Sequence, residues 1–148
     1  MNATPILIPC LHCAAMNRTA ASRIDESPKC GRCHEPLFIG RSIGLTVADF
    51  DKYALRGELP LLVDFWAPWC GPCVSMAPAF EAAAKTLEPR MRLAKVDTEA
   101  ESALGARFAI RSIPTMILFA GGREIARQSG AMSAEQIARW ARAQLPQV

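Results

Sequence analysis

The stretch LLVDFWAPWCGPC, residues 61–73, decides the fold. Its first six residues form a nearly continuous apolar run, which is typical of a strand covered on both faces. The cysteines Cys70 and Cys73 follow, and residues 72–87 are predicted to form a helix with an internal kink at Pro78. The cysteine pair therefore lies where a buried strand is followed by a helix.

This position favours redox chemistry at the pair. A sulfur at Cys70 faces free backbone N–H groups and the positive end of the helix dipole, so we expect a lowered pKa and an exposed nucleophile. Cys73 lies one turn further along the helix, where it reaches Cys70 but is more covered. Gly71 and Pro72 keep the loop tight and start the helix. Cys70 is predicted to attack a substrate disulfide, and Cys73 to resolve the mixed disulfide.

The rest of residues 41–148 alternates helical and strand patterns. The expected elements are a helix after Thr46 with Asp49 in its first turn, a strand at 92–97, a short helix at 101–108, a hairpin of 115–120 and 123–128 around Gly121 and Gly122, and a last helix capped by Ser133 with Ile137, Trp140, Ala141 and Leu145 on one face. This order predicts an α/β fold, a mixed central sheet flanked by helices.

Residues 1–40 differ from the rest of the chain. They hold four of the six cysteines and few large apolar residues, and the interval AAMNRTAASRIDESPK (14–29) has no sustained helical or strand period. A segment this short and this poor in apolar surface needs a cross-link to fold. We therefore predict a small N-terminal module at 1–40 and a larger domain at 41–148.

The four N-terminal cysteines have the spacing of a metal site. Cys10, Cys13, Cys30 and Cys33 form C-x2-C-x16-C-x2-C, which is typical of a four-cysteine zinc site with ligands at about 2.3 Å. Each C-x-x-C segment is expected to form a knuckle, a tight turn that contributes two thiolates. Gly31 is expected to permit the turn of the second knuckle, and backbone N–H groups of the knuckle can donate hydrogen bonds to the sulfurs. One structural zinc, with no open coordination position, would supply the missing cross-link.

Two alternatives remain for this segment. His12 and His34 are possible ligands, although solvent-facing histidines are the simpler interpretation beside four cysteines. A pair of redox-labile disulfides could also join the four cysteines. However, the CGRC segment follows no buried apolar strand, has no proline and precedes no clear helix, so it lacks what makes WCGPC reactive.

The composition excludes several function classes. The net charge of +3 and the absence of a dense Lys/Arg run give no case for nucleic acid or a membrane surface. No apolar stretch approaches the ~20 residues of a membrane span, and the N-terminus lacks the pattern of a secretory leader. We therefore expect a cytoplasmic protein, and a reducing compartment favours metal binding or redox catalysis over structural disulfides.

The segment DFWAPWCGPC resembles the active-site segment of thioredoxins. RSIPT (111–115) is similar to the cis-proline loop of that family, and SGAMS (129–133) to its glycine stretch before the last helix. Together with the N-terminal module, the chain resembles the zinc-containing thioredoxins of the thioredoxin 2 type. The resemblance implies a thioredoxin fold with a small zinc-ribbon-like module.

The family also implies roles for two charged residues. Asp64 lies within an apolar strand, where a carboxylate is costly unless it is paired or functional. The matching carboxylate of thioredoxins assists proton transfer at the resolving cysteine, here Cys73, and Lys95 matches a lysine close to it. The alternatives are an Asp64 paired structurally with Lys95, and a Lys95 that is merely a surface lysine at a strand edge.

The resemblance further implies a substrate-binding surface around the cysteines. Its expected residues are Trp69, Gly71, Pro72, Ile113, Pro114 and Gly130. Pro114 is expected to be cis, with the Ile113 backbone pairing to an extended substrate, although an ordinary strand-start proline is the alternative. Trp66 is expected to support the site and Trp140 to belong to the core. Val74 stands where many thioredoxins carry Lys or Arg, which leaves a more apolar surface.

The function implied is reduction of protein disulfides. The expected partners are disulfide-containing proteins and an NADPH-dependent thioredoxin reductase, and the chain is expected to act as a monomer with no nucleotide cofactor of its own. Two other classes compete: a zinc-module interaction protein that uses the thioredoxin domain as a scaffold, and a periplasmic oxidant or isomerase. The intact cysteine pair disfavours the scaffold, and the Gly71-Pro72 dipeptide disfavours the oxidant.

Overall fold

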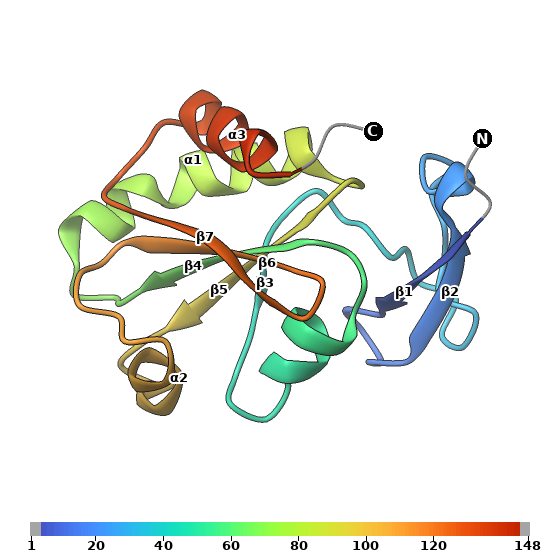
Figure 1. Ribbon diagram of the computed structural model, residues 1–148, viewed down its shortest axis with the longest axis horizontal. Helices are drawn as coiled ribbons and strands as arrows, with labels where there is room; N and C mark the ends of the chain where they lie inside the picture. The colour runs from blue at the N-terminus through green and yellow to red at the C-terminus, as the bar shows by residue number, and fades with distance from the viewer. Residues whose placement is uncertain (1–3, 146–148) are drawn as a thin grey trace.

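A computed structural model describes residues 4–145 of the chain (Figure 1). These residues contain two sheets of unequal size. The small sheet is a hairpin of β1 (Pro5–Pro9) and β2 (Met16–Ala20), followed by a 3-10 turn η1 (Ala21–Arg23). The larger sheet has the strand order β3-β5-β4-β6-β7. Its elements are β3 (Ile43–Gly44), η2 (Lys52–Arg56), β4 (Leu61–Trp66), α1 (Gly71–Leu87), β5 (Arg92–Asp97), α2 (Ser102–Arg107), β6 (Thr115–Ala120), β7 (Arg123–Ser129) and α3 (Ala134–Ala143).

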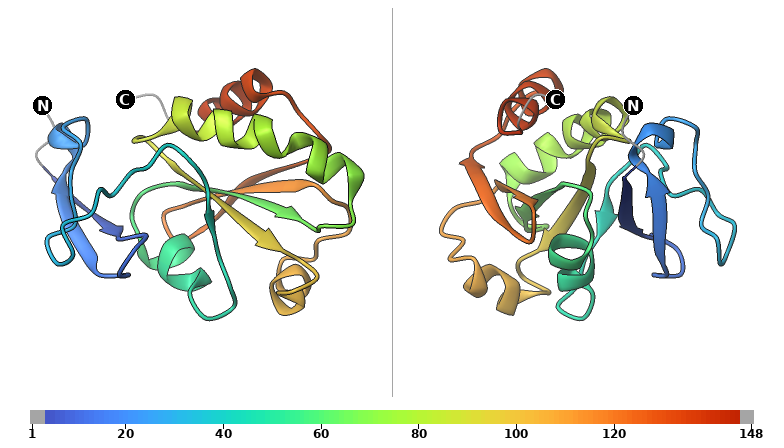
Figure 2. Two further views of the ribbon diagram at one scale, coloured as in Figure 1. Left: turned by 180° about the vertical axis from the view of Figure 1, so that it is seen from behind. Right: turned by 45° about the vertical axis from the view of Figure 1, so that its right-hand side comes forward.

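The N-terminal hairpin lies at one end of the larger sheet, near the C-terminal end of α1 (Figure 2). Its own core is small: Ile8, Ile24 and Leu37 are buried together with Cys10 and Cys30, and Leu59 of the larger domain joins them. The small size of this core agrees with the expectation that the module needs a cross-link.

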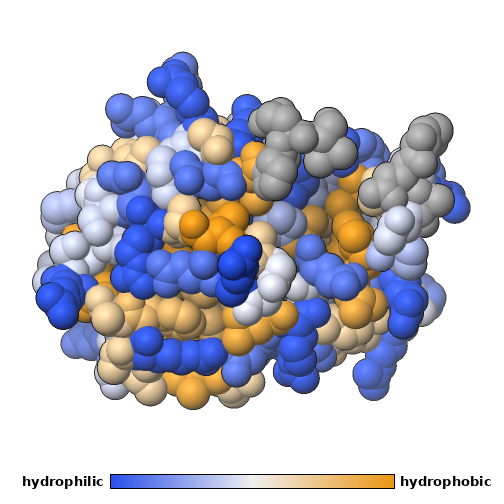
Figure 3. Space-filling view, viewed as in Figure 1, coloured by the Kyte–Doolittle hydropathy of each residue, from blue (hydrophilic) through white to orange (hydrophobic). Residues whose placement is uncertain are grey.

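The face seen in Figure 1 is mixed in character. Hydrophilic residues are spread over this face, and hydrophobic residues show between them (Figure 3). Within residues 4–145, no helix is both long enough and apolar enough to cross a bilayer.

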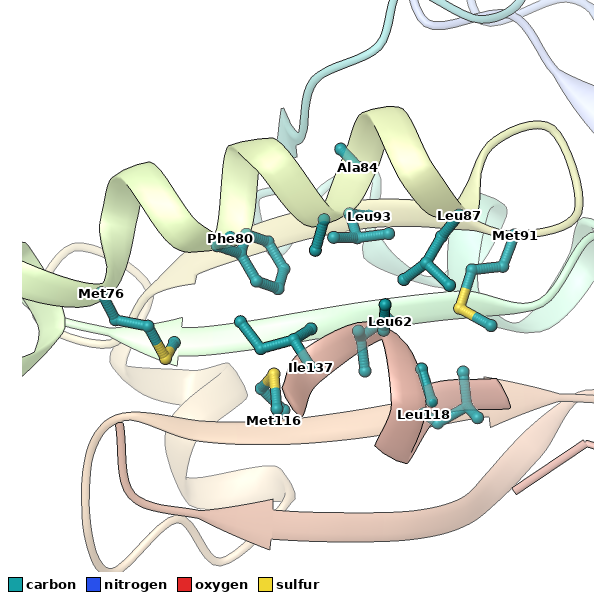
Figure 4. Packing of buried hydrophobic residues seen from close by; sticks show 13 residues of the cluster. Leu62, Met76, Phe80, Ala84, Leu87, Met91, Leu93, Met116, Leu118 and Ile137 are labelled. Atoms are coloured by element: carbon teal, nitrogen blue, oxygen red, sulfur yellow. The ribbon is translucent and has the colours of Figure 1, made fainter. Parts of the chain in front are cut away.

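The position of β4 inside the sheet explains why its sequence is almost entirely apolar. The strand runs parallel to β5 and antiparallel to β6, and each of its faces is covered. Leu62 packs toward α1 and α3, where side chains such as Phe80 and Ile137 meet it (Figure 4). Leu61 and Val63 pack on the opposite face, toward η2 and α2. Asp64 therefore lies on the face that α1 covers.

Most elements of the larger domain agree with their sequence patterns, so the predicted α/β class is confirmed. The helix α1 begins at Gly71 and continues through Pro78 to Leu87. At α3, Ser133 and Gln136 form a capping box, and Trp140 packs half-buried against the core. The segment after Thr46 becomes a π-helical turn, η2, preceded by a hydrogen bond from the Thr46 N–H to the Asp49 carboxylate of 2.7 Å.

Three short strands were not predicted. The strand β1 begins and ends with proline, β2 is polar and largely accessible, and β3 has only two residues. Strands of this kind have no buried face long enough to impose a period of two on the sequence.

Candidate active site and metal centre

The Cys70–Cys73 pair forms a disulfide at the N-terminus of α1. Cys70 is the N-cap residue, and its sulfur accepts the backbone N–H of Cys73 at 3.2 Å. Cys73 is 1% exposed and Cys70 6%, so Cys73 is the more covered, as predicted. The expectation of an exposed nucleophile was wrong for this oxidised form, because Cys70 is buried in a cluster with Ala67 and Cys73, against which Trp66 and Ile113 pack.

A loop distant in sequence contacts this disulfide, and a second loop is hydrogen-bonded to the first. The Ile113 carbonyl oxygen lies 3.8 Å from the Cys70 sulfur, and Ile113 packs with Trp66 against the buried cysteines. The Ile113–Pro114 peptide is cis, as predicted. Gly130, in a left-handed conformation that favours glycine (φ 101°), donates its N–H to the Pro114 carbonyl at 2.9 Å. The three segments that the sequence singled out therefore meet beside the disulfide.

The surface around the disulfide is apolar. Trp69 and Val74 are 70% and 53% exposed, and Gly71 and Pro72 are also exposed. A groove of about 410 Å³ extends from Trp69. Its lining includes Thr98, Ile110, Arg111, Ser112 and Ile113. The groove therefore offers apolar side chains, among them Trp69, Ile110 and Ile113, beside polar ones.

Asp64 is completely buried, and neither of its carboxylate oxygens has a hydrogen-bond partner within residues 4–145. Burial raises its pKa to about 7, and the nearby charge of Lys95 only partly opposes this, while Glu81 adds to the rise. Lys95 is the neighbour of Asp64 in the sheet register, but its ammonium stacks over the Trp66 ring at 4.5 Å. Among the described residues no direct ion pair joins Asp64 and Lys95, and Lys95 is half-buried rather than fully at the surface.

The two N-terminal C-x-x-C segments adopt the same knuckle. Cys10 donates its N–H to the Ala15 carbonyl at 2.8 Å, and Cys30 donates to Glu35 at 2.9 Å. In each knuckle the residue after the second cysteine, Ala14 or His34, has a positive φ and donates back to the first cysteine at 2.9–3.0 Å. The expectation for Gly31 was therefore wrong: the left-handed position comes later in the turn.

Backbone N–H groups also point at the sulfurs, as predicted. Those of His12 and Cys13 donate to the Cys10 sulfur at 3.3 and 3.5 Å, and that of Arg32 donates to the Cys30 sulfur at 3.4 Å. Such bonds stabilise thiolates that ligate a metal. The side chains of His12 and His34 are exposed, which leaves the cysteines as the donor set.

The four sulfurs fit a tetrahedral metal ion. All lie within 4.8 Å of one another, and the distances Cys10–Cys33 and Cys13–Cys30 are both 3.6 Å. Four sulfurs at 2.3 Å from a zinc ion would be about 3.8 Å apart. All four cysteines are free, so the alternative of two disulfides is not what the structure contains. The Glu35 N–H lowers the pKa of Cys33, but burial and the neighbouring thiols outweigh it and raise that pKa to about 12, whereas the Cys33 N–H lowers the pKa of Cys30 to about 5.

Sequence reasoning missed several residues of these sites. Asn17 joins the knuckles: its carbonyl accepts the Gly31 N–H at 2.8 Å, and its amide lies 3.6 Å from the Cys30 sulfur. Tyr53 and Arg92 contact the backbone of the module from the larger domain. No short motif marks these residues, because each acts across the fold. The one available signal is Arg92, a charged residue at the start of β5 that is followed by the apolar residues Leu93 and Ala94.

A helix-capping C-x-x-C disulfide on a mixed sheet covered by helices defines a dithiol–disulfide oxidoreductase. Comparison with known proteins agrees, since the Thioredoxin family model matches residues 41–143 and the model for the N-terminal region of thioredoxin 2 matches residues 9–35. The chain belongs to the thioredoxin family and carries its N-terminal zinc module.

Individual relatives cover the chain to different extents. Thioredoxin C-3 of Corynebacterium nephridii is 41% identical over 142 residues, which span 96% of this chain and 97% of the relative. The thioredoxin of Alicyclobacillus acidocaldarius is 43% identical over 93 residues, 63% of this chain and 88% of the relative. That of Haemophilus influenzae is 38% identical over 91 residues, 62% and 85% of the two chains.

Proposed function

We propose that this thioredoxin reduces disulfides of other proteins, with Cys70 as the nucleophile and Cys73 as the resolving cysteine. The observation that carries the proposal is a helix-capping disulfide with an exposed apolar surface around it, on a helix that covers the sheet face of a buried, unpaired carboxylate. The test is reduction of insulin disulfides, followed as NADPH consumption in the presence of a thioredoxin reductase. A chain that acted only as a binding scaffold would show no turnover.

The chemistry is two successive thiol–disulfide exchanges. The Cys70 thiolate attacks one sulfur of the substrate disulfide, so a Cys70–substrate bond forms and the second substrate sulfur leaves as a thiolate. Cys73, after losing its proton, attacks the Cys70 sulfur and releases the other substrate sulfur. Two electrons thus pass from the dithiol to the substrate, and Cys70 and Cys73 end as the disulfide. A thioredoxin reductase returns the pair to the dithiol.

Asp64 is the proposed proton acceptor for Cys73. It lies on the sheet face that α1 covers, and Cys73 lies in the first turn of α1. Its raised pKa, about 7, allows it to accept and return a proton near neutral pH. Lys95 is proposed to tune Asp64 by its positive charge, which favours the carboxylate form.

Replacing Asp64 by asparagine is expected to slow insulin reduction by about 10- to 100-fold, at or below the usual contribution of a general acid–base group. An amide has a similar shape but cannot accept the Cys73 proton. The measurement is the pH profile of the rate between pH 6 and 8. Unchanged rates across this range would make Asp64 merely structural.

The same variant is expected to change the pH dependence of stability. The pKa of Asp64 is raised from 3.8 to about 7, so the folded state holds the proton more tightly than the unfolded state. The free energy of unfolding therefore falls between pH 4 and 7, and at about 1.4 kcal/mol per pKa unit the loss is on the order of 4 kcal/mol above pH 7. In denaturant titrations of the oxidised proteins, the stability of Asp64→Asn relative to that of the unaltered chain should therefore be higher at pH 8 than at pH 4. Parallel curves for the two proteins would contradict the raised pKa.

Substrates are proposed to bind across the exposed apolar surface. The proposed contact residues are Trp69, Gly71, Pro72, Ile113, Pro114 and Gly130. An extended peptide can add to the backbone at Ile113, and the rings of Trp69 and Pro72 offer it apolar contact. Val74 extends this surface without charge, since it is 53% exposed.

One structural zinc is proposed at Cys10, Cys13, Cys30 and Cys33. When bound, zinc cross-links the two knuckles and so supplies folding energy to the module. Because all four ligands come from the chain, no position is open for substrate or water. Thiolate sites of this kind persist in reducing compartments, which supports the proposed cytoplasmic location. The protein is also proposed to act as a monomer.

The division into a module at 1–40 and a domain at 41–148 leads to a further test. A chain of residues 41–148 is expected to fold and to reduce insulin, because both large core clusters lie within it. Its free energy of unfolding should be lower by about 1–2 kcal/mol, which corresponds to a Tm lower by roughly 5–10 °C, because Leu59 and Tyr53 lose their partners in the module. Thermal unfolding followed by circular dichroism measures this. Failure of the shorter chain to unfold cooperatively would show that the boundary is wrong.

A further inference from the structure

The first zinc ligand lies on a segment that the larger domain holds directly. The N–H of Leu7 donates to the Glu58 carboxylate, and the N–H of Glu58 donates to the Leu7 carbonyl, both at 2.8 Å. Pro9 lies against Gly57 so closely that a Cβ at Gly57 would be 3.0 Å from the Pro9 ring. The chain that leads into Cys10 is therefore fixed against the loop that follows η2.

Two consecutive carbonyl groups at this ligand accept hydrogen bonds from the larger domain. The Pro9 carbonyl accepts Nη1 of Arg92 at 2.7 Å, and the Cys10 carbonyl accepts the Tyr53 hydroxyl at 2.7 Å. Nη2 of Arg92 donates to the Leu37 carbonyl at 2.6 Å. Arg92 thus joins the chain before the first knuckle to the chain after the second.

Both donors are buried, so these bonds matter more than surface contacts would. Arg92 is 2% exposed and Tyr53 7%. Leaving a buried hydroxyl without a partner destabilises the fold, and leaving a buried charged guanidinium without one destabilises it more. Four thiolates around a divalent cation carry a net charge of about −2, so a buried cation bonded to the residue next to Cys10 also suits the charge of the filled site.

We propose that Tyr53 and Arg92 are positioning residues of the zinc site: they hold the Cys10 backbone in place for metal binding and couple the metal to the stability of the larger domain. This rests on the proposed zinc at the four cysteines. Binding energies are reciprocal, so residues that help the module to retain zinc also let zinc stabilise the domain that supplies them. The module then stabilises the thioredoxin domain to an extent that depends on bound zinc.

The first measurement is zinc release from the full-length, zinc-loaded chain into excess chromogenic chelator. Tyr53→Phe removes a single hydroxyl, and Arg92→Met removes the guanidinium while keeping an apolar stem. Each is expected to release zinc about tenfold faster than the unaltered chain, the low end for residues that orient metal ligands. Arg139→Met is the matched control, because Arg139 pairs with Glu135 on the exposed face of α3.

The second measurement separates positioning from general destabilisation. Thermal unfolding is recorded with zinc bound and after its removal, and the stabilisation by zinc should be smaller in Tyr53→Phe than in the unaltered chain. Equal release rates in all variants, or an equal loss of stability with and without zinc, would overturn the proposal. An unaltered chain that purifies without zinc would instead overturn the zinc site, and this inference with it.

Discussion

Serine at position 70 is expected to abolish disulfide reduction, and serine at position 73 to stop the reaction at the mixed disulfide. A serine hydroxyl does not form the nucleophile that attacks a disulfide near neutral pH, so Cys70→Ser should lower the insulin reduction rate by more than about 1,000-fold. In Cys73→Ser the first exchange still occurs, because Cys70 keeps its place at the N-terminus of α1. Without a resolving thiol the substrate stays attached.

The trapped species gives the decisive measurement. Reduced Cys73→Ser incubated with oxidised protein substrates should yield adducts on non-reducing electrophoresis that dithiothreitol releases. The double variant with serine at both positions is the control and should yield none. If Cys73→Ser turned over at the normal rate, or if adducts formed through Cys73 in Cys70→Ser, the assigned order of attack would be wrong.

The larger domain was predictable because the buried positions of its strands and helices are marked by apolar residues in the sequence. β4 and β6 lie inside the sheet with both faces covered, and both are nearly continuous apolar runs, interrupted in β4 by Asp64. The helix α1 was recognisable from Pro72 in its first turn. The start of α3 was recognisable from Ser133, which forms a capping box with Gln136 in the structure.

The N-terminal module was predictable only as a site, not as a structure. The cysteine spacing indicates the metal, but β2 has no buried face and therefore no period of two. The positive φ of Ala14 was also hidden, because alanine does not favour a left-handed conformation, whereas histidine is enriched there and His34 offered a weak signal. Here the knuckle geometry overrides the local preference that pointed to Gly31.

The redox site shows a different limit. The cysteines, the cis Pro114 and the buried Asp64 follow from local motifs. What local motifs cannot show is how charges meet across strands: Lys95 neighbours Asp64 in the register yet directs its ammonium to Trp66. Arg92 is a stronger case, since its partners Pro9 and Leu37 lie 83 and 55 residues away.

Loss of any one zinc ligand is expected to lose the metal and unfold the module. Cys30→Ser is the sharpest case, because Cys30 is buried and its sulfur also accepts the Arg32 N–H. A four-thiolate structural zinc supplies an apparent folding energy of about 10–16 kcal/mol near pH 7, far more than the module's small core can replace. Metal analysis should find about one zinc in the unaltered chain and almost none in Cys30→Ser.

Thiol counting and amide exchange complete this test. With zinc bound, the reduced unaltered chain should show only Cys70 and Cys73 as freely reactive thiols. Hydrogen exchange should become fast at β1 and β2 in Cys30→Ser while α1 and β4 stay protected, since their core lies within the larger domain. His12→Ala is the control and should keep its zinc, because His12 is exposed beside a ligand. Six reactive thiols and no metal in the unaltered chain, with a redox couple at Cys30 and Cys33, would mean that CGRC shares the chemistry of WCGPC.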